Sequence, residues 1–276
     1  MKLPPTRLFI AVDLEGICGV VTAADVARTG AAAEAARRHL RADLDAVLAG
    51  CLDAGADQIV VCDAHDDGHN LDAEGLPPQV TLVSGSPAPL SMMQGVGADC
   101  AGALFVGYHA RAGTAAAVLA HTWSERVFAV HSGECEVGEL GLCALLAGSV
   151  GVPTLFASGD DKLAVEARAL VPGIVTTVVK TGITRTSAGL CAPDEARSRL
   201  RRDAADAVSA RGAHRPLAWR REPLRVTFTH VEYCDAAAEA PAARRLDGRT
   251  LELNGTAYGE VYRSFVTCMR LAETVR

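Results

Sequence analysis

Residues 8–16 read Leu8-Phe9-Ile10-Ala11-Val12-Asp13-Leu14-Glu15-Gly16, a run of five apolar residues followed by two acidic ones. A short, continuous apolar run is typical of a strand that is buried on both faces at the centre of a sheet. The same arrangement recurs twice. Residues 58–62 lead into Asp63-Ala64-His65, and residues 103–106 lead into Gly107-Tyr108-His109. We therefore expect three buried strands, each with polar side chains at its carboxyl end.

The segments around these strands have helical spacing. Residues 31–54 are rich in alanine, carry larger apolar residues at helical intervals and end at Gly55, which suits the position after a helix. Farther along, the pattern predicts helices over 137–149, 161–170 and 193–211 and strands over 153–157 and 175–179. Strands that alternate with helices build a parallel sheet with right-handed crossovers. The expected fold class is α/β, a mostly parallel sheet with flanking helices.

After Pro216 the regular alternation of predicted strands and helices ends. Residues 224–230 alternate like a strand, Asp247-Gly248 is a hairpin signal, and residues 258–275 have the spacing of a closing helix. We expect a main α/β domain over residues 1–213 and a smaller α+β lobe over residues 214–276.

Composition narrows the class of protein. The 276 residues are 49% hydrophobic and 22% charged, which is typical of a globular protein with a substantial core. Because 33 acidic residues outnumber 27 basic ones, the net charge of −6 disfavours nucleic acid and anionic membranes as partners. These numbers favour an ordinary globular protein whose partners are neither nucleic acid nor membrane surfaces.

The beginning of the chain and its cysteines bear on its location. Met1-Lys2-Leu3-Pro4-Pro5 does not open a signal peptide, and no run of eighteen apolar residues occurs. The nine cysteines are odd in number and form no C-x-x-C pair, which favours reduced thiols used as small hydrophobic residues. We expect a cytoplasmic protein without structural disulfides.

The strongest functional signal is the convergence of side chains that bind metals. The carboxyl ends of parallel strands meet at one edge of a sheet, so Asp13 and Glu15 should lie near His65 and His109. Residues two apart in extended backbone project to the same side, so Asp13 and Glu15 can share one or two cations. Carboxylates combined with imidazoles suit zinc, manganese, cobalt or iron. The four residues therefore predict a dinuclear hydrolytic metal centre.

Other polar residues remain open to two interpretations. Asp63, Asp66 and Asp67 either orient His65 or form the turn that follows its strand. Five further histidines lack such a context and are expected to have structural roles: His39, His69, His131, His214 and His230.

Seven segments, in order along the chain, resemble the D-aminopeptidase family of dipeptide-transport operons, the M55 metallopeptidases. They are residues 12–17 (VDLEGI), 63–65 (DAH), 102–111 (GALFVGYHAR), 121–122 (HT), 137–142 (VGELGL), 159–161 (GDD) and 180–188 (KTGITRTSA). The resemblance runs from about residue 8 to about residue 195 and is weak over the last eighty residues.

The resemblance implies a site for two zinc ions per chain, with manganese, cobalt or iron as alternatives. In it, Asp13 bridges both ions. Glu15 and His65 complete one set of ligands, and His109 and Glu139 complete the other. Relatives also form large ring-shaped homo-oligomers, so the resemblance implies an oligomer here, such as a decameric ring.

The resemblance further implies that His121 is a catalytic histidine beside the metals and not a ligand. It also singles out Glu139, which the residues alone do not separate from Glu134 and Glu136, since an acidic residue at a helix start commonly serves the helix dipole. Cys18 departs from the family pattern, in which serine is expected, and we predict that it is neither a ligand nor a nucleophile.

The expected function is that of a zinc-dependent aminopeptidase, an enzyme that hydrolyses N-terminal, D-configured residues from small peptides through a water activated by two metals. Two alternatives remain. The same site can serve an amidohydrolase acting on a lactam or an amino-acid amide, since a site can be retuned on an unchanged fold. The other alternative is a metal-dependent assembly protein without turnover.

Overall fold

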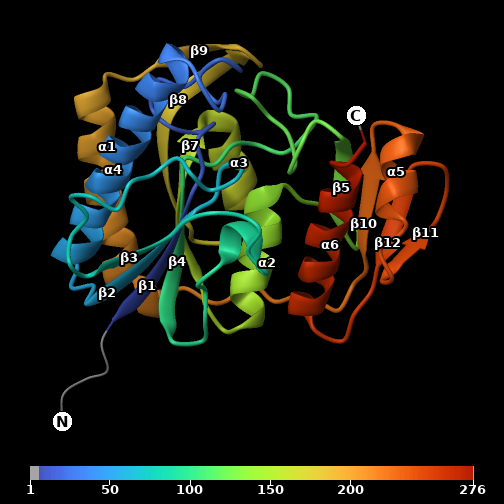
Figure 1. Cartoon of the computed structure of the whole chain (residues 1–276). Coiled ribbons are helices and arrows are strands. Elements are labelled where there is room, and N and C mark those ends of the chain that lie inside the picture. Colours follow the sequence, from blue (N-terminus) through green and yellow to red (C-terminus); the bar gives the residue numbers. More distant parts are fainter. Residues whose placement is uncertain (1–5, 276) are drawn as a thin grey trace.

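The computed structural model describes residues 6–275 and places a seven-stranded sheet at the centre of the main body (Figure 1). The strand order is β3-β2-β1-β4-β7-β8-β9, and every neighbouring pair is parallel except β8 and β9. The bounds are Arg7–Val12 (β1), Gln58–Asp63 (β2), Val80–Val83 (β3), Cys100–Val106 (β4), Thr154–Asp160 (β7), Val175–Thr184 (β8) and Ser187–Leu190 (β9). The predicted α/β fold with a mostly parallel sheet is confirmed.

Strand β1 lies in the middle of this sheet, and its position explains its apolar sequence. Leu8, Ile10 and Val12 belong to one hydrophobic core and Phe9 and Ala11 to the other, because successive side chains point to opposite faces. All five are fully buried. The last residue of β1 pairs with the last residues of β2 and β4. The carboxyl ends of these three strands therefore stand level, as the sequence predicts.

Helices cover both faces of the sheet. The helices α1 (Ala31–Asp53) and α4 (Pro193–Ser209) pack together on one face, and α2 (Glu139–Ser149) and α3 (Asp161–Leu170) cover the other (Figure 1). Gly55 follows α1 with a φ of 83°, a conformation that glycine adopts without strain. Two 3₁₀ turns, η1 (Ser91–Met93) and η2 (Arg211–Ala213), complete the main body.

A second, antiparallel sheet forms the lobe and has the order β11-β12-β10-β5-β6. Its strands are Val127–Ser132 (β5), Cys135–Glu136 (β6), Leu224–Phe228 (β10), Ala243–Arg245 (β11) and Thr250–Leu253 (β12), and its helices are Val231–Ala237 (α5) and Tyr258–Ala272 (α6). The lobe expected over residues 214–276 thus also takes in residues 127–136. The sequence did not reveal β6, which has only two residues, or β5, whose six residues do not alternate regularly between buried and exposed.

The lobe and the main body share a hydrophobic core. Helix α6 packs against α2 (Figure 1), and one continuous cluster of buried residues contains Leu142 of α2, Phe265 of α6 and Val226 of β10. Within residues 6–275, no helix is both long and apolar enough to cross a bilayer. The segment Met1–Pro5, on which the expectation about a signal peptide rests, lies outside the described residues.

Candidate metal centre

Six side chains of ligand type meet at the carboxyl edge of the main sheet. Asp13 and Glu15 follow β1, His65 follows β2 and His109 follows β4, whereas Glu139 begins α2. His121 lies in the loop between β4 and β5. Their side chains are between 1% and 18% exposed, and His121 is the most exposed of them. All six predicted site residues are therefore brought together.

The first group of ligand atoms consists of Asp13, Glu15 and His65. Nδ1 of His65 lies 3.3 Å from Oδ1 of Asp13 and 3.1 Å from Oε2 of Glu15. On the other side of the ring, Nε2 donates to the carbonyl oxygen of Val26 at 3.2 Å. Because a carbonyl can only accept, this hydrogen bond leaves Nδ1 to face the two carboxylates.

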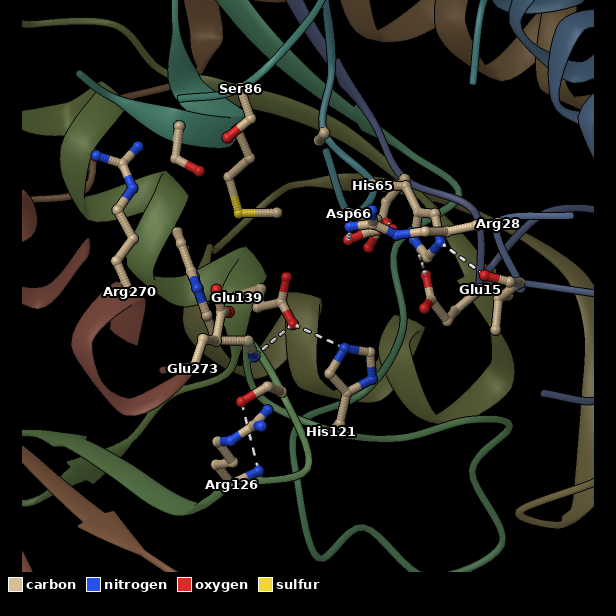
Figure 2. Close-up of a pocket in the computed structure, with 17 residues that line it drawn as sticks. Glu15, Arg28, His65, Asp66, Ser86, His121, Arg126, Glu139, Arg270 and Glu273 are labelled. Atoms are coloured by element: carbon tan, nitrogen blue, oxygen red, sulfur yellow. Dashed lines mark hydrogen bonds and ion pairs between the residues drawn. The ribbon is translucent and has the colours of Figure 1, made fainter. Parts of the chain in front are cut away.

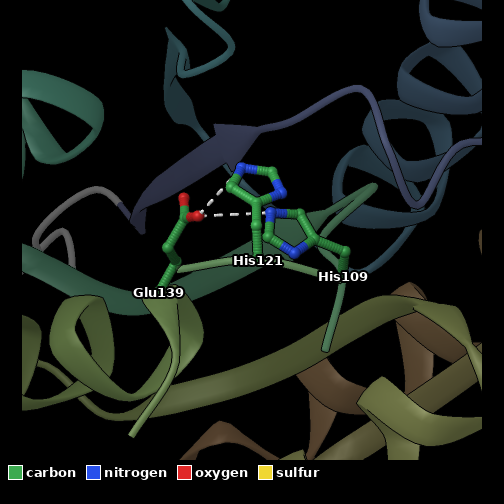
Figure 3. Close-up of side chains that lie close together, drawn as sticks. All are labelled: His109, His121 and Glu139. Carbon is green, nitrogen blue, oxygen red and sulfur yellow. Dashed lines mark ion pairs between the residues drawn. The ribbon is translucent and has the colours of Figure 1, made fainter. Parts of the chain in front are cut away.

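The second group consists of His109, His121 and Glu139 (Figure 3). Oε1 of Glu139 lies 3.3 Å from Nε2 of His109 and 3.5 Å from Nε2 of His121. The two imidazole rings stack with 4.1 Å between their centroids. Their Nδ1 atoms donate to the carbonyl oxygens of Ala110 (3.0 Å) and Leu119 (2.9 Å), so both Nε2 atoms point at Glu139.

Asp13 joins the two groups. Its Oδ1 faces His65, and its Oδ2 lies 3.4 Å from Nε2 of His109. Close approach of the backbone makes this possible, since a Cβ on Gly107 would lie 2.2 Å from the carbonyl oxygen of Asp13 and one on Gly16 would lie 1.9 Å from that of Tyr108. Glycine at both positions lets the ends of β1 and β4 touch.

Three buried atoms in the centre have no hydrogen-bond partner among the described residues: Oδ2 of Asp13, Oε2 of Glu15 and Nε2 of His109. Each belongs to a residue of one of the two groups, and the residues of each group can bring one ligand atom apiece to within 4.8 Å of one another. Each histidine also donates its other N–H to a backbone carbonyl, as histidines that bind metals do. The donor set therefore fits two transition-metal ions, and carboxylate with imidazole suits zinc.

The electrostatics of the site favour positive charge. Burial and the neighbouring charge of Glu15 raise the pKa of Asp13 to about 6. Burial opposes the charged form of His65, but the carboxylates of Glu15 and Asp13 outweigh it and raise its pKa to about 12. For His109, burial likewise acts against the charge, yet Glu139 and Asp13 raise the pKa to about 10. The same negative charge that keeps protons on the imidazoles also attracts metal ions. A metal ion that binds the imidazoles displaces those protons.

The aspartates after β2 have separate tasks. Asp63 accepts hydrogen bonds from the backbone N (2.6 Å) and Nδ2 (3.0 Å) of Asn70, which in turn donates to the carbonyl oxygen of His65 at 2.8 Å. Asp66 and Asp67 form ion pairs with Arg28. Asp63 therefore orders the loop that carries His65, whereas Asp66 and Asp67 do not contact its ring.

The structure also separates residues that the sequence left equivalent. Of the three glutamates before and at the start of α2, Glu139 reaches the centre, and Glu136 forms an ion pair with Arg111 at 3.2 Å. The five histidines expected to be structural lie outside both ligand groups. Cys18 is likewise outside them; burial raises the pKa of its thiol to about 11, and its backbone N donates to Asp43.

A cavity of about 460 Å³ opens onto the ligands (Figure 2). Its far wall includes Arg126, Arg270 and Glu273, the last two from the C-terminal end of the lobe, whereas Arg28 lies beside His65 (Figure 2). Sequence reasoning missed these residues because they come from distant segments that share no motif. Lys180 begins the family-like segment 180–188, but sequence reasoning assigned it no role; it is a buried cation whose pKa burial lowers to about 8.

Comparisons with known proteins agree with this geometry. The D-aminopeptidase family model of M55 peptidases matches residues 6–267. A D-aminopeptidase of Bacillus subtilis (strain 168) is 31% identical over 268 residues, which cover 96% of this chain and 97% of the relative. The solved structure of the Zn-dependent D-aminopeptidase DppA from Bacillus subtilis, described as a self-compartmentalizing protease, has a TM-score of 0.93 at 30% identity and covers 97% of this chain and 98% of its own. The chain belongs to the D-aminopeptidase family of M55 metallopeptidases.

Proposed function

We propose that the protein is a zinc-dependent aminopeptidase that removes N-terminal, D-configured residues from small peptides, with two zinc ions per chain. The D-configuration and zinc follow the relatives, one named a D-aminopeptidase and the other a Zn-dependent D-aminopeptidase. The observation that carries the dinuclear part is the orientation of Asp13, whose two carboxylate oxygens face different ligand groups.

The ligand sets follow from this orientation. Asp13, Glu15 and His65 would hold one zinc, and Asp13, His109 and Glu139 would hold the other. When bound, two zinc ions supply an acidified water and stabilise negative charge on the oxygen of the scissile carbonyl. No side-chain nucleophile is then needed.

His121 is the residue that we assign to proton transfer. Its Nδ1–H donates to the carbonyl oxygen of Leu119, so Nε2 is the ring nitrogen left to exchange a proton. Its side chain is 18% exposed, against 1% for His109 and 6% for Glu139, and it lines the cavity. From there, Nε2 can take the proton that the attacking water loses and pass it to the nitrogen of the leaving amine. His121 thus acts on the substrate beside the metals.

The cavity sets the size of the substrate. A volume of about 460 Å³ suits a peptide of a few residues and not a folded protein. Because the related DppA structure is described as a self-compartmentalizing protease, we also propose that this chain forms a homo-oligomer, such as a decameric ring, that restricts access to the site.

A substrate panel tests the function. Zinc-loaded protein is given matched pairs of D- and L-aminoacyl peptides, N-acetylated versions of the same peptides, and amino-acid amides. We expect release of the free N-terminal D-residue, with kcat/KM at least tenfold above that of the L-peptide and no turnover of the acetylated peptide. Turnover of the acetylated peptide, or of amides alone, would contradict an aminopeptidase.

A further inference from the structure

A lysine on a strand three positions away from β1 in the main sheet contacts the loop that carries Glu15. Lys180 lies on β8, which is separated from β1 by β4 and β7, and it is fully buried. Its Nζ donates to three backbone carbonyl oxygens: those of Glu15 (2.5 Å), Ile17 (3.0 Å) and Val20 (2.6 Å). All three carbonyls belong to the segment that leaves β1, so one side chain gathers both ends of residues 15–20.

The chemistry of an ammonium group matches this task. Lysine carries three N–H donors around one nitrogen, whereas arginine presents its donors in a flat fork. The chain uses arginine for nearly all of its positive charges, since only Lys2, Lys162 and Lys180 among its 27 basic residues are lysines. A lysine is therefore rare in this chain, and Lys180 stands where three carbonyl oxygens surround one nitrogen atom.

Lys180 does not belong to the catalytic machinery itself. It does not line the cavity that opens onto the ligands, and its Nζ points at carbonyl oxygens. The second ligand group is held by other contacts, among them a hydrogen bond from the backbone N of Trp123 to Oε1 of Glu139 at 2.7 Å. Lys180 contacts the backbone of one metal ligand, Glu15.

We infer that Lys180 is a positioning residue that sets Glu15 against His65 and thereby tunes the affinity of one of the two zinc sites. The inference rests on the proposed dinuclear function. Without the ammonium group, the carbonyl oxygens of Glu15 and Val20 lose their donor, that of Ile17 keeps only the backbone N–H of Val20, and the segment must shift to satisfy them. A shift of the segment moves Glu15 but leaves His109 and Glu139 in place, so the two zinc sites respond differently.

The test is a zinc competition titration of full-length Lys180→Met, with a chromophoric chelator, beside Lys162→Met as the matched control. Lys162 is 29% exposed and pairs with its neighbour Asp161. We expect one zinc of Lys180→Met to bind roughly 10- to 100-fold more weakly, as when an outer partner of a metal ligand is removed, and the other to bind as in wild type. Activity should return at excess zinc, because the role is exerted through the metal.

A second variant separates positioning from folding. Lys180→Gln keeps two N–H donors, so it should fold and bind the weaker zinc with an affinity between those of wild type and Lys180→Met. Equal weakening of both sites, unchanged affinity at both, or failure of both variants to fold would overturn the positioning role. A wild-type protein that binds about one zinc would instead contradict the proposed dinuclear function, while leaving the effect of Lys180 on that zinc measurable.

Discussion

His121 shows most clearly how burial and orientation divide one cluster into different tasks. It stacks on His109 and faces the same oxygen of Glu139, yet it is the more exposed of the two rings. A ligand histidine takes its metal with it when removed, whereas a residue that transfers a proton contributes only as the transition state forms.

We therefore expect His121→Ala to keep its zinc and its stability, with KM for a D-aminoacyl peptide nearly unchanged and kcat lower by roughly 10² to 10⁴. Steady-state kinetics and elemental analysis of the same preparation check this. His214→Ala, which removes a histidine outside both ligand groups, serves as the control. A variant that loses zinc would make His121 a ligand, and one with wild-type kcat would end its assignment to proton transfer.

At the scale of elements, the junction of β1 with β4 holds the two ligand groups together. Gly107 follows β4 with a φ of 71°, and a Cβ there would lie 2.2 Å from the carbonyl oxygen of Asp13 and 2.5 Å from Cδ1 of Ile17. Alanine at this position must push the two strand ends apart.

The change Gly107→Ala should lower the free energy of unfolding by about 1–3 kcal/mol, the usual effect of overfilling a packed site, and should weaken zinc binding as well. Urea denaturation and the zinc titration measure the two effects. Gly173→Ala is the matched control, because Gly173 also has a positive φ, of 81°, and a Cβ there meets no atom within 4 Å. If the two variants unfold at the same urea concentration, the close approach of β1 and β4 is not what holds the centre.

The elements that carry the ligands were predictable because their sequences report burial directly. The runs in β1, β2 and β4 are apolar throughout, and parallel topology then requires the residues that follow them to meet. Strands β3, β5, β6 and β9 were not predicted. Strands β3, β6 and β9 have at most four residues, and β5 lacks a regular alternation of buried and exposed side chains. Their pairing depends on distant partners, such as β10 for β5, which local patterns do not report.

The residues of the candidate site also fall into those that the sequence predicts and those that it does not. Asp13, Glu15, His65 and His109 follow from topology, but Glu139 starts a helix next to two equivalent glutamates, and only the resemblance to relatives separated it from them. The residues of the far wall of the cavity come from distant segments, so no local spacing marks them. Lys180 begins a segment that resembles the family, but its contacts with residues 15–20 depend on the folded sheet.

At the scale of the whole molecule, the metals should stabilise the fold that builds their site. The centre buries three carboxylates in one place, and their mutual repulsion opposes folding unless cations offset it. A ligand that binds only the folded state stabilises it by about 2.7 kcal/mol when present at 100 times its dissociation constant.

Removal of zinc by a chelator should accordingly lower the Tm, and added zinc, but not magnesium, should restore it. Differential scanning calorimetry of holo, chelated and reconstituted protein checks this. The Asp13→Ala variant is the reference, because its Tm should not respond to zinc. A wild-type Tm that is the same with and without zinc would show that the centre does not bind the metal tightly.

In the proposed centre one carboxylate, that of Asp13, is shared by two metals, and the number of zinc ions per chain tests that directly. Elemental analysis of zinc-reconstituted protein after gel filtration should give about two zinc ions per wild-type chain, close to none for Asp13→Ala, and about one each for His65→Ala and His109→Ala. Asp45→Ala, which removes an exposed carboxylate of α1 that pairs with Arg41, should keep both. A wild-type chain with one zinc, or an Asp13→Ala chain that retains a zinc, would contradict the bridging role of Asp13.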